Sequence, residues 1–460
     1  MYTFIFDIGK TNIKGHVLDQ EGAPVWSRSC SNEPDRSEPY WHFDIDRTWS
    51  WLLDVLREAA ASYPLSAINV STHGACAVLL DNDDSLALPV LDYEFDELSI
   101  AGLEYQQIRP PFEKTHSPAL GAGLNLGKQL WWLKNRFPQQ FQTVDKVLMY
   151  PQYWVYKLTG IAVTELTSVG CHTDLWEPQG ACYSSLVSEL GIEQALPPIV
   201  RATESIGGVL PQLAAELGLP ASCEVFAGVH DSNAGFARYL SVFPDAQFTA
   251  VSTGTWVVTM SGSADLNALR EEADTLTNIS VTGMPLPCAR FMGGREYEEI
   301  CRLTGASAEA QYTLGDIQQI VNSEAMALPP FAKGSGPFAR GGRSGELVGK
   351  ADSGVALASL YLALMIDYEL SLLKAQGRVL LGGIARKNPI LCQLLAQLRP
   401  DQHFYAANDK ASTILGAWCL TRWGQPLPAS FSDFSRAQAA TIEGLVEYRD
   451  AWRARAEKPL

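Results

Sequence analysis

Several features that define common protein classes are missing from this sequence. Its nine cysteines form no CxxC pair and no Cys/His spacing of a zinc site, so we expect reduced thiols and no structural zinc. No basic cluster offsets the formal net charge of -16, which makes a nucleic acid an unexpected partner. The longest apolar stretch, residues 355–366, is too short to cross a bilayer, and no signal-peptide pattern opens the chain. We therefore expect a cytoplasmic protein without a membrane partner.

The usual marks of hydrolases and nucleotide-binding loops are missing as well. The chain contains neither a GxSxG nor an HExxH motif. The glycine-rich segment 121–128 has the wrong spacing for a dinucleotide loop, and Gln129 stands where a Walker loop needs Ser or Thr. We expect this segment only to lead into a helix.

What the chain does have is the size and composition of a folded two-domain protein. It is 460 residues long, 47% apolar and 19% charged. A chain of this length usually folds into more than one domain, each with its own hydrophobic core. Strand-like and helix-like segments alternate, which favours an α/β fold. A change of texture near Pro244 predicts domains at 1–240 and 241–460. Predicted strands cover residues 2–7, 13–18, 68–71, 77–80, 224–229 and 378–381, and predicted helices cover 46–62, 124–137, 145–158, 210–219 and 356–374.

Residues 7–14 form a predicted hairpin whose groups suit phosphate binding. Gly9 allows a sharp turn and lets phosphate oxygens approach backbone N–H groups. Side-chain donors and a compensating charge follow in Thr11, Asn12 and Lys14. Asp7, at the end of the strand, could hold Mg²⁺ through water. Taken alone, the segment fits an ordinary glycine-turn hairpin better.

A second predicted hairpin, at residues 248–260, repeats this geometry with hydroxyl groups in place of the acid. Thr253, Gly254 and Thr255 form its turn, so two such hairpins could hold a polyphosphate from both sides. Later in the chain, Gly382 and Gly383 end a strand and leave room for a flat adenine ring. Asn388 can donate and accept hydrogen bonds at the edge of that ring.

Residues 228–234 combine the end of a strand with the start of a helix. Asp231 or Ser232 is placed to cap that helix. The helix dipole would keep a carboxylate there ionised, which suits a base that accepts a hydroxyl proton as a phosphoryl group leaves ATP. Capping alone would explain the residue, and only its conjunction with the two hairpins favours a base.

In this order, the four segments resemble the FGGY family of carbohydrate kinases, and the resemblance covers nearly the whole chain. It implies a two-domain, actin-like (ribonuclease H-like) ATPase fold with an active-site cleft between the domains. Residues 230–232 and 253–256 are most similar to those of fuculokinases and rhamnulokinases. The resemblance also implies ATP and Mg²⁺ as cofactors and a sugar as the second substrate, and it leaves a homodimer open.

The resemblance further implies roles for individual residues. Asp231 would be the catalytic base, and Asp7 with Asp231 would flank the Mg²⁺. The phosphates would contact Gly9, Lys10, Thr11, Asn12, Lys14, Thr253, Gly254 and Thr255. The adenosine would contact Gly294, Gly382, Gly383 and Asn388. The sugar would contact His73, Gly74, Asp92, His230 and Asp231.

Three features depart from the family pattern. Deoxyketose kinases usually have Gly-Val-Asp after the second strand, whereas residues 73–76 of this chain are His-Gly-Ala-Cys. The W-x-D-x-R sugar motif keeps Asp92 but has Glu94 in place of the arginine. Lys10 stands where relatives often have Thr or Ala, and it either contacts phosphate or points into solvent. We expect no catalytic thiol at Cys76, which has no paired base in the sequence, and no metal ligand at His172.

We therefore predict direct, in-line transfer of a phosphate from ATP to a terminal hydroxyl, C1 or C5, of a ketose. The candidate substrates are a 6-deoxyketohexose, of the L-fuculose or L-rhamnulose type, and a pentulose. One alternative is a sugar-sensing paralogue on the same fold that has lost catalysis, against which the intact Asp7 and Asp231 argue. Another is an actin-like filament or chaperone-type ATPase, which sugar-independent ATP hydrolysis would support.

Overall fold

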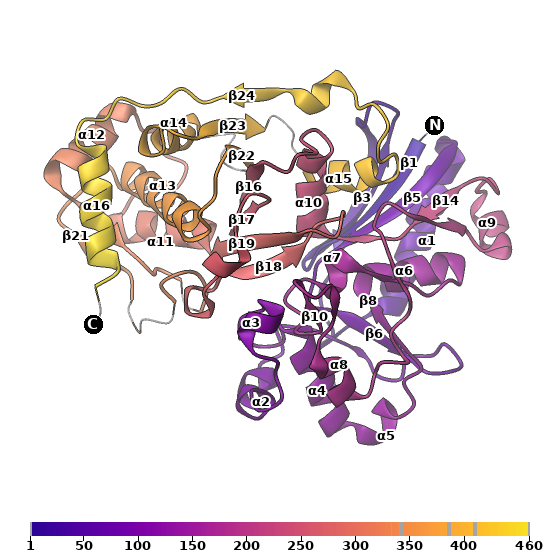
Figure 1. The fold of residues 1–460 in the computed structure, drawn as a ribbon. Helices are drawn as coiled ribbons and strands as arrows, with labels where there is room; N and C mark the ends of the chain where they lie inside the picture. Colours follow the sequence, from indigo (N-terminus) through magenta and orange to yellow (C-terminus); the bar gives the residue numbers. More distant parts are fainter. Residues whose placement is uncertain are drawn as a thin grey trace. The chain divides into compact units, whose positions relative to one another are not determined.

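The computed structural model describes residues 2–332, 334–339, 342, 344–383, 388–407 and 412–458 (Figure 1). The chain forms two compact units. Unit 1 comprises Met1–Pro244, Thr277–Pro285 and Ala411–Phe431, and unit 2 comprises Asp245–Leu276, Leu286–Lys410 and Ser432–Leu460. Each unit is built around one seven-stranded sheet. Two later segments thus return to unit 1 after the chain has entered unit 2.

The sheet of unit 1 is mixed: β1, β2 and β3 are antiparallel, β5 runs parallel to β1, β14 and β15, and β13 is antiparallel to β14. Its order is β13-β14-β5-β1-β2-β3, and β15 also pairs with β5. These strands are β1 (Tyr2–Ile8), β2 (Asn12–Leu18), β3 (Pro24–Ser31), β5 (Leu65–Thr72), β13 (Ser205–Gly208), β14 (Glu224–Phe226) and β15 (Val229–His230). The predicted strands 2–7, 13–18 and 68–71 are confirmed. The predicted strand 224–229 is divided into β14 and β15 before Gly228, whose φ of +79° interrupts the extended backbone.

The two faces of this sheet are covered by different helices. Phe4, Phe6 and Ile8 point to one face, where they share a core with α1 (Ile45–Ser62) and α6 (Tyr150–Thr159). The other face packs against α10 (Asp231–Leu240) and α15 (Ser412–Leu420). There Asn69 Nδ2 donates to the Ala417 oxygen at 2.9 Å. Asp7 alternates with Phe6 and Ile8 and therefore lies on the α10 face.

The sheet of unit 2 repeats an arrangement of the first sheet, in which a strand runs parallel to the first strand of a hairpin. Its order is β18-β19-β17-β16-β22-β23-β24, in which β16 and β17 form the hairpin and β22 runs parallel to β16. The strands are β16 (Phe248–Thr253), β17 (Val257–Ser261), β18 (Leu276–Ile279), β19 (Pro285–Phe291), β22 (Arg378–Gly383), β23 (His403–Ala407) and β24 (Phe434–Arg436). Of β18, only Leu276 is counted in unit 2, because the segment Thr277–Pro285 belongs to unit 1. The predicted hairpin and the strand 378–381 are confirmed.

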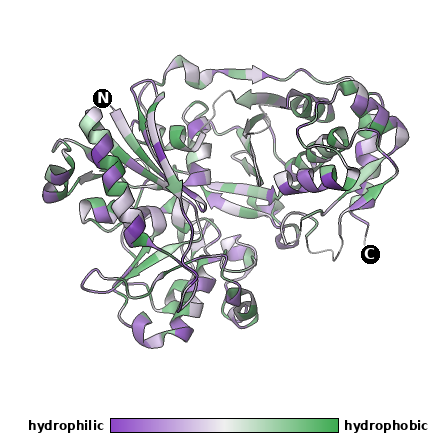
Figure 2. Ribbon diagram, turned by 180° about the vertical axis from the view of Figure 1, so that it is seen from behind, coloured by the Kyte–Doolittle hydropathy of each residue, from purple (hydrophilic) through white to green (hydrophobic). Residues whose placement is uncertain are grey.

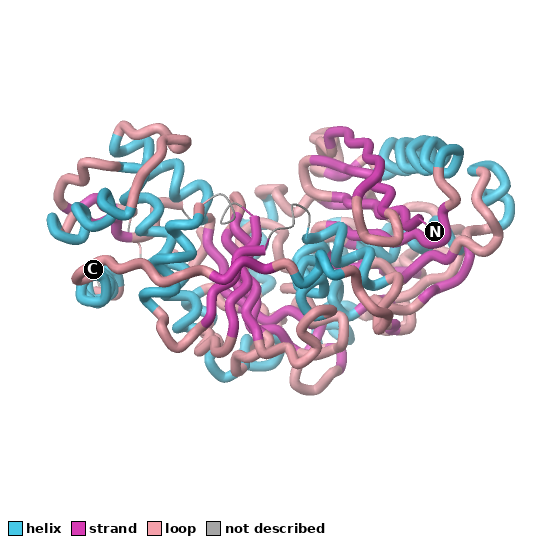
Figure 3. The backbone as a smooth tube through the Cα atoms, turned by 90° about the horizontal axis from the view of Figure 1, so that it is seen from above, coloured by secondary structure: helices cyan, strands magenta, loops and turns pink. Residues whose placement is uncertain are grey.

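The helices of unit 2 gather along one side of its sheet (Figures 1 and 3). They include α11 (Gly293–Thr304), α12 (Leu314–Ser323), α13 (Gly354–Leu372), α14 (Pro389–Leu398) and α16 (Leu445–Ala456). By length and composition α13 could cross a membrane, but 78% of its most apolar window is buried inside the protein. We therefore describe α13 as a core helix, as its sequence predicted.

The remaining elements of unit 1 are short and build the loops beside its sheet. They are β4 (His42–Phe43), β6 (Ala77–Leu80), β7 (Val90–Leu91), β8 (Lys146–Met149), β9 (Thr164–Glu165), β10 (Trp176–Glu177), β11 (Cys182–Tyr183), β12 (Ile199–Val200), α2 (Glu97–Tyr105), α3 (Phe112–Thr115), α4 (Leu126–Arg136), α5 (Pro138–Phe141), α7 (Leu166–Val169), α8 (Ser185–Leu190) and α9 (Pro211–Leu217). Two further strands, β20 (Met326–Leu328) and β21 (Glu346–Val348), pair in unit 2. Apolar residues line the strands of both sheets (Figure 2).

One predicted helix is wrong over its first half. Residues 145–158 were predicted as a single helix, but 146–149 form β8, which pairs with β6, and α6 begins only at Tyr150. Val147, Leu148 and Met149 are fully buried. A short apolar run of this kind fits a buried strand and a buried helix equally well, so tertiary pairing decides between them.

Candidate active site

Asp7 stands at the end of β1, on the face of the unit 1 sheet that α10 covers. It lies opposite Lys14 in β2 and Ser71 in β5. Burial raises the pKa of Asp7 to about 6, the charge of Asp231 adds to that rise, and Lys14 opposes it. The carboxyl groups of Asp7 and Asp231 are therefore close enough to repel each other when both are ionised.

The turn that follows Asp7 uses one of its own backbone donors. Gly9 N donates to the Asn12 oxygen at 2.9 Å. Asn32 anchors the turn from β3's end, because its Nδ2 donates to the Gly9 oxygen at 2.8 Å and its N donates to the Thr11 oxygen at 2.9 Å. The side chains of Thr11, Asn12 and Lys14 are exposed. Phosphate binding at this turn would rest on those side chains rather than on the Gly9 N–H.

Helix α10 begins at Asp231 itself. Its N-cap is His230, whose side chain makes no capping hydrogen bond, so the prediction that Asp231 or Ser232 caps the helix is wrong. Strand β15 extends through His230, and the chain turns helical one residue earlier than capping by Asp231 requires. Asp231 Oδ1 accepts from Ser232 N at 2.5 Å, and the side chain stays 34% exposed. The carboxylate is thus held at the positive end of the helix with solvent access.

His230 lies behind this carboxylate. Its Nδ1 donates to Asn233 Oδ1 at 2.7 Å, and its Nε2 lies 3.3 Å from Asp231 Oδ1 and 3.8 Å from Cys171 Sγ. Burial alone would lower the pKa of His230, but the charges of Cys171 and Asp231 outweigh burial and raise it. The raised pKa favours the protonated ring, a form in which both ring nitrogens can donate.

Cys171 is the site residue that sequence reasoning missed. Burial would raise the pKa of its thiol, but His172 and His230 lower it well below its usual range. Cys171 lies 59 residues before the histidine that it contacts, and no motif spacing links the two positions. His172 itself is half-buried and donates from Nδ1 to the Leu124 oxygen at 2.6 Å.

The start of α10 is also tied to a buried acid. His230 N donates to Thr167 Oγ1 at 3.1 Å, and Thr167 Oγ1 donates to Glu165 Oε2 at 2.5 Å. Burial raises the pKa of Glu165 to about 7. This chain of contacts fixes the backbone one residue before Asp231, and it could not be read from the sequence because Glu165 lies 65 positions earlier.

The loop after β5 carries His73 and Gly74. His73 Nδ1 donates to the Gly74 oxygen at 2.9 Å, and burial lowers the pKa of His73, so its Nε2 carries a lone pair. That Nε2 is buried and has no hydrogen-bond partner among the described residues. A Cβ on Gly74 would lie 2.9 Å from His230 Nε2, which explains the glycine. The structure therefore brings His73, Gly74 and His230 together.

Asp92 is held in the loop after β7. Its side chain is 1% exposed, its Oδ1 forms an ion pair with Lys10 Nζ, and the same oxygen accepts from Glu94 N at 3.1 Å. Asp92 Oδ2 is buried without a hydrogen-bond partner in the described part of the chain. Lys10, which was predicted to contact phosphate or solvent, thus turns from the hairpin toward the segment predicted to bind sugar.

In unit 2, the second hairpin has the predicted form. Gly254 N donates to the Trp256 oxygen at 2.9 Å, as Gly9 does within its own turn. Thr253 Oγ1 donates to the Gly382 oxygen at 2.6 Å, which ties the hairpin to β22. Gly294 N donates to the Thr255 oxygen at 3.1 Å, and a Cβ on Gly294 would lie 2.5 Å from the Gly254 oxygen. Gly294 therefore packs directly against the turn.

The predicted adenosine residues lie where β22 ends and α14 begins. Gly383 has a φ of +73°, and a Cβ there would lie 2.0 Å from the Thr253 oxygen. Asn388 is the N-cap of α14, and its Oδ1 accepts from Leu391 N at 3.2 Å and from Tyr312 Oη at 2.6 Å. Its Nδ2 donates to Ser359 Oγ at 3.2 Å. Residues 384–387 of the same motif lie outside the described residues.

The chemistry of Asp7 and Asp231 fits Mg²⁺. Among the described residues, no group of three or more His, Cys, Asp and Glu side chains is arranged to hold a metal ion. Mg²⁺ keeps several waters and needs only one or two carboxylates together with phosphate oxygens. A cation near both carboxylates would relieve the repulsion that helps to raise the pKa of Asp7.

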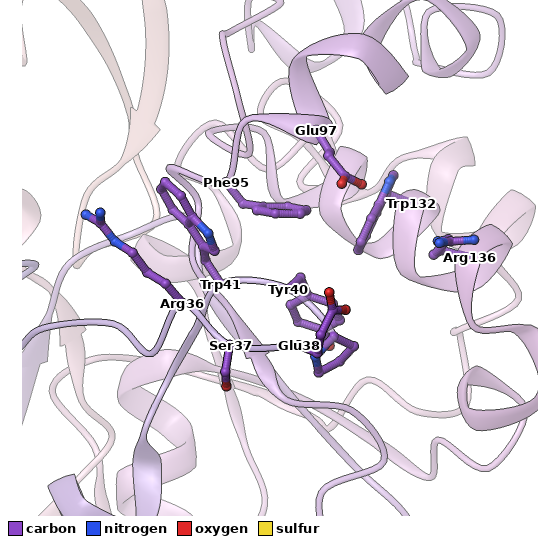
Figure 4. A pocket seen from close by; sticks show the side chains of 10 residues that line it. Arg36, Ser37, Glu38, Tyr40, Trp41, Phe95, Glu97, Trp132 and Arg136 are labelled. Carbon is purple, nitrogen blue, oxygen red and sulfur yellow. The ribbon is translucent and has the colours of Figure 1, made fainter.

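A separate hollow in unit 1 opens beside the Asp92 segment (Figure 4). Its volume is about 210 Å³, and the side chains of Tyr40, Phe95 and Trp132 surround it. The backbone joins it to Asp92, whose N donates to the Trp41 oxygen at 2.8 Å and whose oxygen accepts from Phe95 N at 3.0 Å. None of the predicted site residues lines this hollow.

Comparisons with known proteins identify the family to which this chain belongs. The N-terminal domain of the FGGY family of carbohydrate kinases matches residues 2–237, and the C-terminal domain of carbohydrate kinase FGGY matches residues 245–428. An L-fuculokinase of Salmonella typhi is 25% identical over 341 residues, which cover 72% of this chain and 70% of that protein. A probable L-xylulose kinase of Pasteurella multocida is 27% identical over 272 residues, or 56% of this chain and 55% of that protein.

Solved structures show the same fold. A carbohydrate kinase from Novosphingobium aromaticivorans is 34% identical, with a TM-score of 0.90 over 99% of this chain and 100% of that one. A xylulose kinase from Lactobacillus acidophilus, at 18% identity, has a TM-score of 0.80 over 99% of this chain and 97% of that one. The actin-like fold predicted from the sequence is confirmed. This chain belongs to the FGGY family of carbohydrate kinases and is an ATP-dependent sugar phosphotransferase.

Proposed function

We propose that this kinase phosphorylates a terminal hydroxyl of a ketose, with Asp231 as the base that accepts the hydroxyl proton. The observation that carries the proposal is the position of Asp231, which is the first residue of α10, partly exposed and backed by His230 at 3.3 Å. The Asp231 carboxylate thus lies at the N-terminus of α10 and beside a histidine ring, and a carboxylate is a group that can accept a proton from a hydroxyl. Transfer then proceeds directly from ATP to the sugar oxygen, without a covalent enzyme intermediate.

The second carboxylate has a different role in the proposal. Asp7 and Asp231 would hold Mg²⁺, which supplies neutralisation of phosphate charge when bound. Asp7 suits this role because it ends β1 beside the exposed hairpin, and burial with the nearby charge of Asp231 gives it a raised pKa that a cation would lower. Lys14, opposite Asp7, supplies a further positive charge near the phosphates.

Sugar binding is assigned to the loops after β5 and β7. His73 Nε2 and Asp92 Oδ2 are both buried acceptors without partners in the described part of the chain. Hydroxyl groups of a sugar would satisfy them, and an unpaired buried acceptor otherwise costs about 1–3 kcal/mol. The named relatives act on L-fuculose and L-xylulose by their titles, which supports a 6-deoxyketohexose or a pentulose, phosphorylated at C1 or C5.

For ATP, the proposal keeps the two hairpin turns inferred from the sequence, but not Lys10, which pairs with Asp92. The turns would contact the phosphates through the exposed side chains of Thr11, Asn12 and Thr255 and through Gly254, whereas Thr253 is buried and its Oγ1 donates to the Gly382 oxygen. The adenosine is assigned to the end of β22 and the start of α14, with Gly382, Gly383 and Asn388. Because ATP is both a substrate and a cytoplasmic metabolite, we place the reaction in the cytoplasm.

The test is ATP consumption with a panel of L-fuculose, L-rhamnulose, D-xylulose, L-xylulose and D-ribulose. We expect one or two of these ketoses to support turnover, and we expect Asp231→Asn to reduce kcat by about 10²–10⁴-fold while ATP and sugar still bind. Asp54→Asn is the matched control, because Asp54 is 75% exposed on α1 and pairs only with Arg57 in the next turn. Full activity of Asp231→Asn would exclude Asp231 as the base.

Two other outcomes would favour the alternative functions. Sugar binding without ATP consumption by any ketose would support a sugar-sensing protein that has lost catalysis. ATP hydrolysis that does not depend on sugar would support an ATPase of the filament or chaperone type. Strict dependence on a ketose would exclude both.

A further inference from the structure

The side chain of Lys10 leaves the hairpin that carries it. Lys10 lies in the turn between β1 and β2, next to Gly9 and Thr11, where a lysine would ordinarily be assigned to phosphate. Its ammonium group instead pairs with Asp92 Oδ1 and lies 3.6 Å from Glu94 Oε2. The side chain is only 16% exposed. Lys10 is therefore packed against the loop after β7 rather than extended into solvent.

Two aromatic rings hold the ammonium group in this position. Lys10 Nζ lies 4.9 Å from the centre of the Phe43 ring and 5.0 Å from the centre of the Tyr93 ring. Rings at this distance attract a cation, and the attraction is stronger where water is largely excluded. A move of Lys10 toward phosphate would give up both rings and leave Asp92, whose side chain is 1% exposed, as a buried carboxylate without its cation.

Next to the Lys10 ammonium group, one oxygen of Asp92 accepts no hydrogen bond from the described residues. Asp92 Oδ1 is taken by Lys10 and by Glu94 N, while Asp92 Oδ2 is buried and has no partner within the described residues. Close by, the His73 ring stands 5.2 Å from the Phe43 ring and 5.7 Å from the Tyr93 ring, and its Nε2 is a second unpaired acceptor. An ammonium donor beside a free carboxylate oxygen matches two neighbouring hydroxyl groups, one accepting from Nζ and one donating to Oδ2.

We propose that Lys10 is a specificity-determining residue of the sugar site, where its ammonium group and Asp92 together bind neighbouring hydroxyls of a neutral sugar. The inference rests on the proposed function, because it assumes that the sugar binds beside Asp92. It also accounts for a departure noted in the sequence. Glu94 occupies the position at which the W-x-D-x-R pattern has an arginine, and Lys10 supplies a cation to that segment from a different strand end.

The charges of Lys10, Asp92 and Glu94 determine which sugars bind to this site. Lys10 is balanced by Asp92, and Glu94 adds a negative charge that is 60% exposed. A sugar acid would bring a carboxylate against Glu94, whereas a neutral ketose brings only hydroxyl groups. We therefore expect neutral sugars to bind more tightly than sugar acids of the same length.

The experiment compares Lys10→Met with Lys14→Met, two lysines of one hairpin. We expect Lys10→Met to raise KM for the ketose by about tenfold or more and to change KM for ATP by less than about twofold, and we expect Lys14→Met to do the reverse. Calorimetric titration of each variant with the ketose in the absence of ATP gives a readout independent of turnover. A rise in KM for ATP alone in Lys10→Met would overturn the proposal.

A second pair of variants guards against simple misfolding. Lys10→Met leaves Asp92 without its cation, so the double variant Lys10→Met/Asp92→Asn removes both charges and keeps the shapes of the side chains. If the pair acts as one unit, the double variant binds the ketose no more weakly than the worse single variant. Additive losses would show that Lys10 acts elsewhere.

The outcomes for the proposed function and for Lys10 can be told apart. A wild-type protein that binds a ketose but does not consume ATP would contradict the proposed function, and calorimetry would still test Lys10. A wild-type protein that consumes ATP with a ketose, while Lys10→Met binds that ketose unchanged, would overturn the role of Lys10 alone. If no ketose of the panel bound, both would be overturned.

Discussion

The same strand arrangement occurs twice in this protein, and the two copies carry different chemistry. In unit 1, the pair next to the turn's closing pair is Asp7 opposite Lys14. In unit 2, the equivalent pair is Ser252 opposite Val258, without a charge. The difference teaches that the fold supplies a tight turn between two neighbouring strands inside a sheet, while one register position decides whether a charged pair lies beside that turn.

The strand beside each hairpin differs as well. The last residue of β1 pairs with Thr72 in unit 1, whereas the last residue of β16 pairs with Gly383 in unit 2. Gly383 has a left-handed backbone and touches the Thr253 oxygen so closely that no side chain fits. In unit 2, the end of β22 therefore packs directly against the end of β16, and its left-handed backbone at Gly383 requires glycine.

The largest effect is expected from removing the charge at the unit 1 position. Asp7→Asn should lower kcat by about 10²-fold and raise the Mg²⁺ concentration needed for half-maximal rate, because the carboxylate that we propose to hold Mg²⁺ is lost. Ser252→Ala, the equivalent change in unit 2, should change kcat by less than about fivefold, because it removes only a neutral group. Steady-state kinetics over a range of Mg²⁺ concentrations would measure both. Equal losses would break the comparison.

A smaller effect, on stability, is expected from the glycine of unit 2. Gly383→Ala should lower the free energy of unfolding by about 2–4 kcal/mol, because overpacking adds to the strain of a left-handed alanine. Gly305→Ala is the matched control. Its φ of +70° is similar, but no atom lies within 4 Å of the added Cβ, so the loss should be only about 1 kcal/mol. Urea unfolding of both variants would separate the clash from the backbone strain.

The smallest effect concerns one buried acid in each unit. Burial raises the pKa of Glu165 in unit 1 and of Glu296 in unit 2 to about 7. Each acid stays protonated in the folded protein after it has ionised in the unfolded chain, so its stabilisation is complete below about pH 4.5 and is lost as the pH rises through about 7. Glutamine at either position should remove that loss, which is at most about 3 kcal/mol.

The two acids should differ in their effect on catalysis. Glu165→Gln should also lower kcat, because Glu165 orients Thr167 and through it the backbone of His230. Glu296→Gln should leave kcat unchanged, because Glu296 bonds to Tyr361 and Ala332 N within unit 2. Urea unfolding and kinetics at about pH 5 and about pH 8 would check both statements. A drop in kcat for Glu296→Gln would show that the buried acid of unit 2 also supports the site.

Local patterns predicted the elements whose signals lie in neighbouring residues. The hairpins at 2–18 and 248–260 were predicted because short strand-like runs and the glycine turn between them are both local features. The strand β8 was taken for helix, because its buried run has no periodicity of its own and pairing with β6 decides it. The segments Thr277–Pro285 and Ala411–Phe431 belong to unit 1 through contacts made far along the chain.

The residues of the site divide in the same way, into those identified by local sequence signals and those set by contacts between distant segments. Asp7, Asp231 and the two turns stand at ends of elements, and the sequence alone identified them as candidates and placed the chain in its family. Only the tertiary structure set Cys171 against His230, Thr167 against the backbone of His230, and Lys10 on Asp92. These contacts join residues 82 positions apart in the case of Lys10 and Asp92. A turn is determined by its own few residues, whereas burial and the pairing of charges depend on every segment that the fold brings to one place.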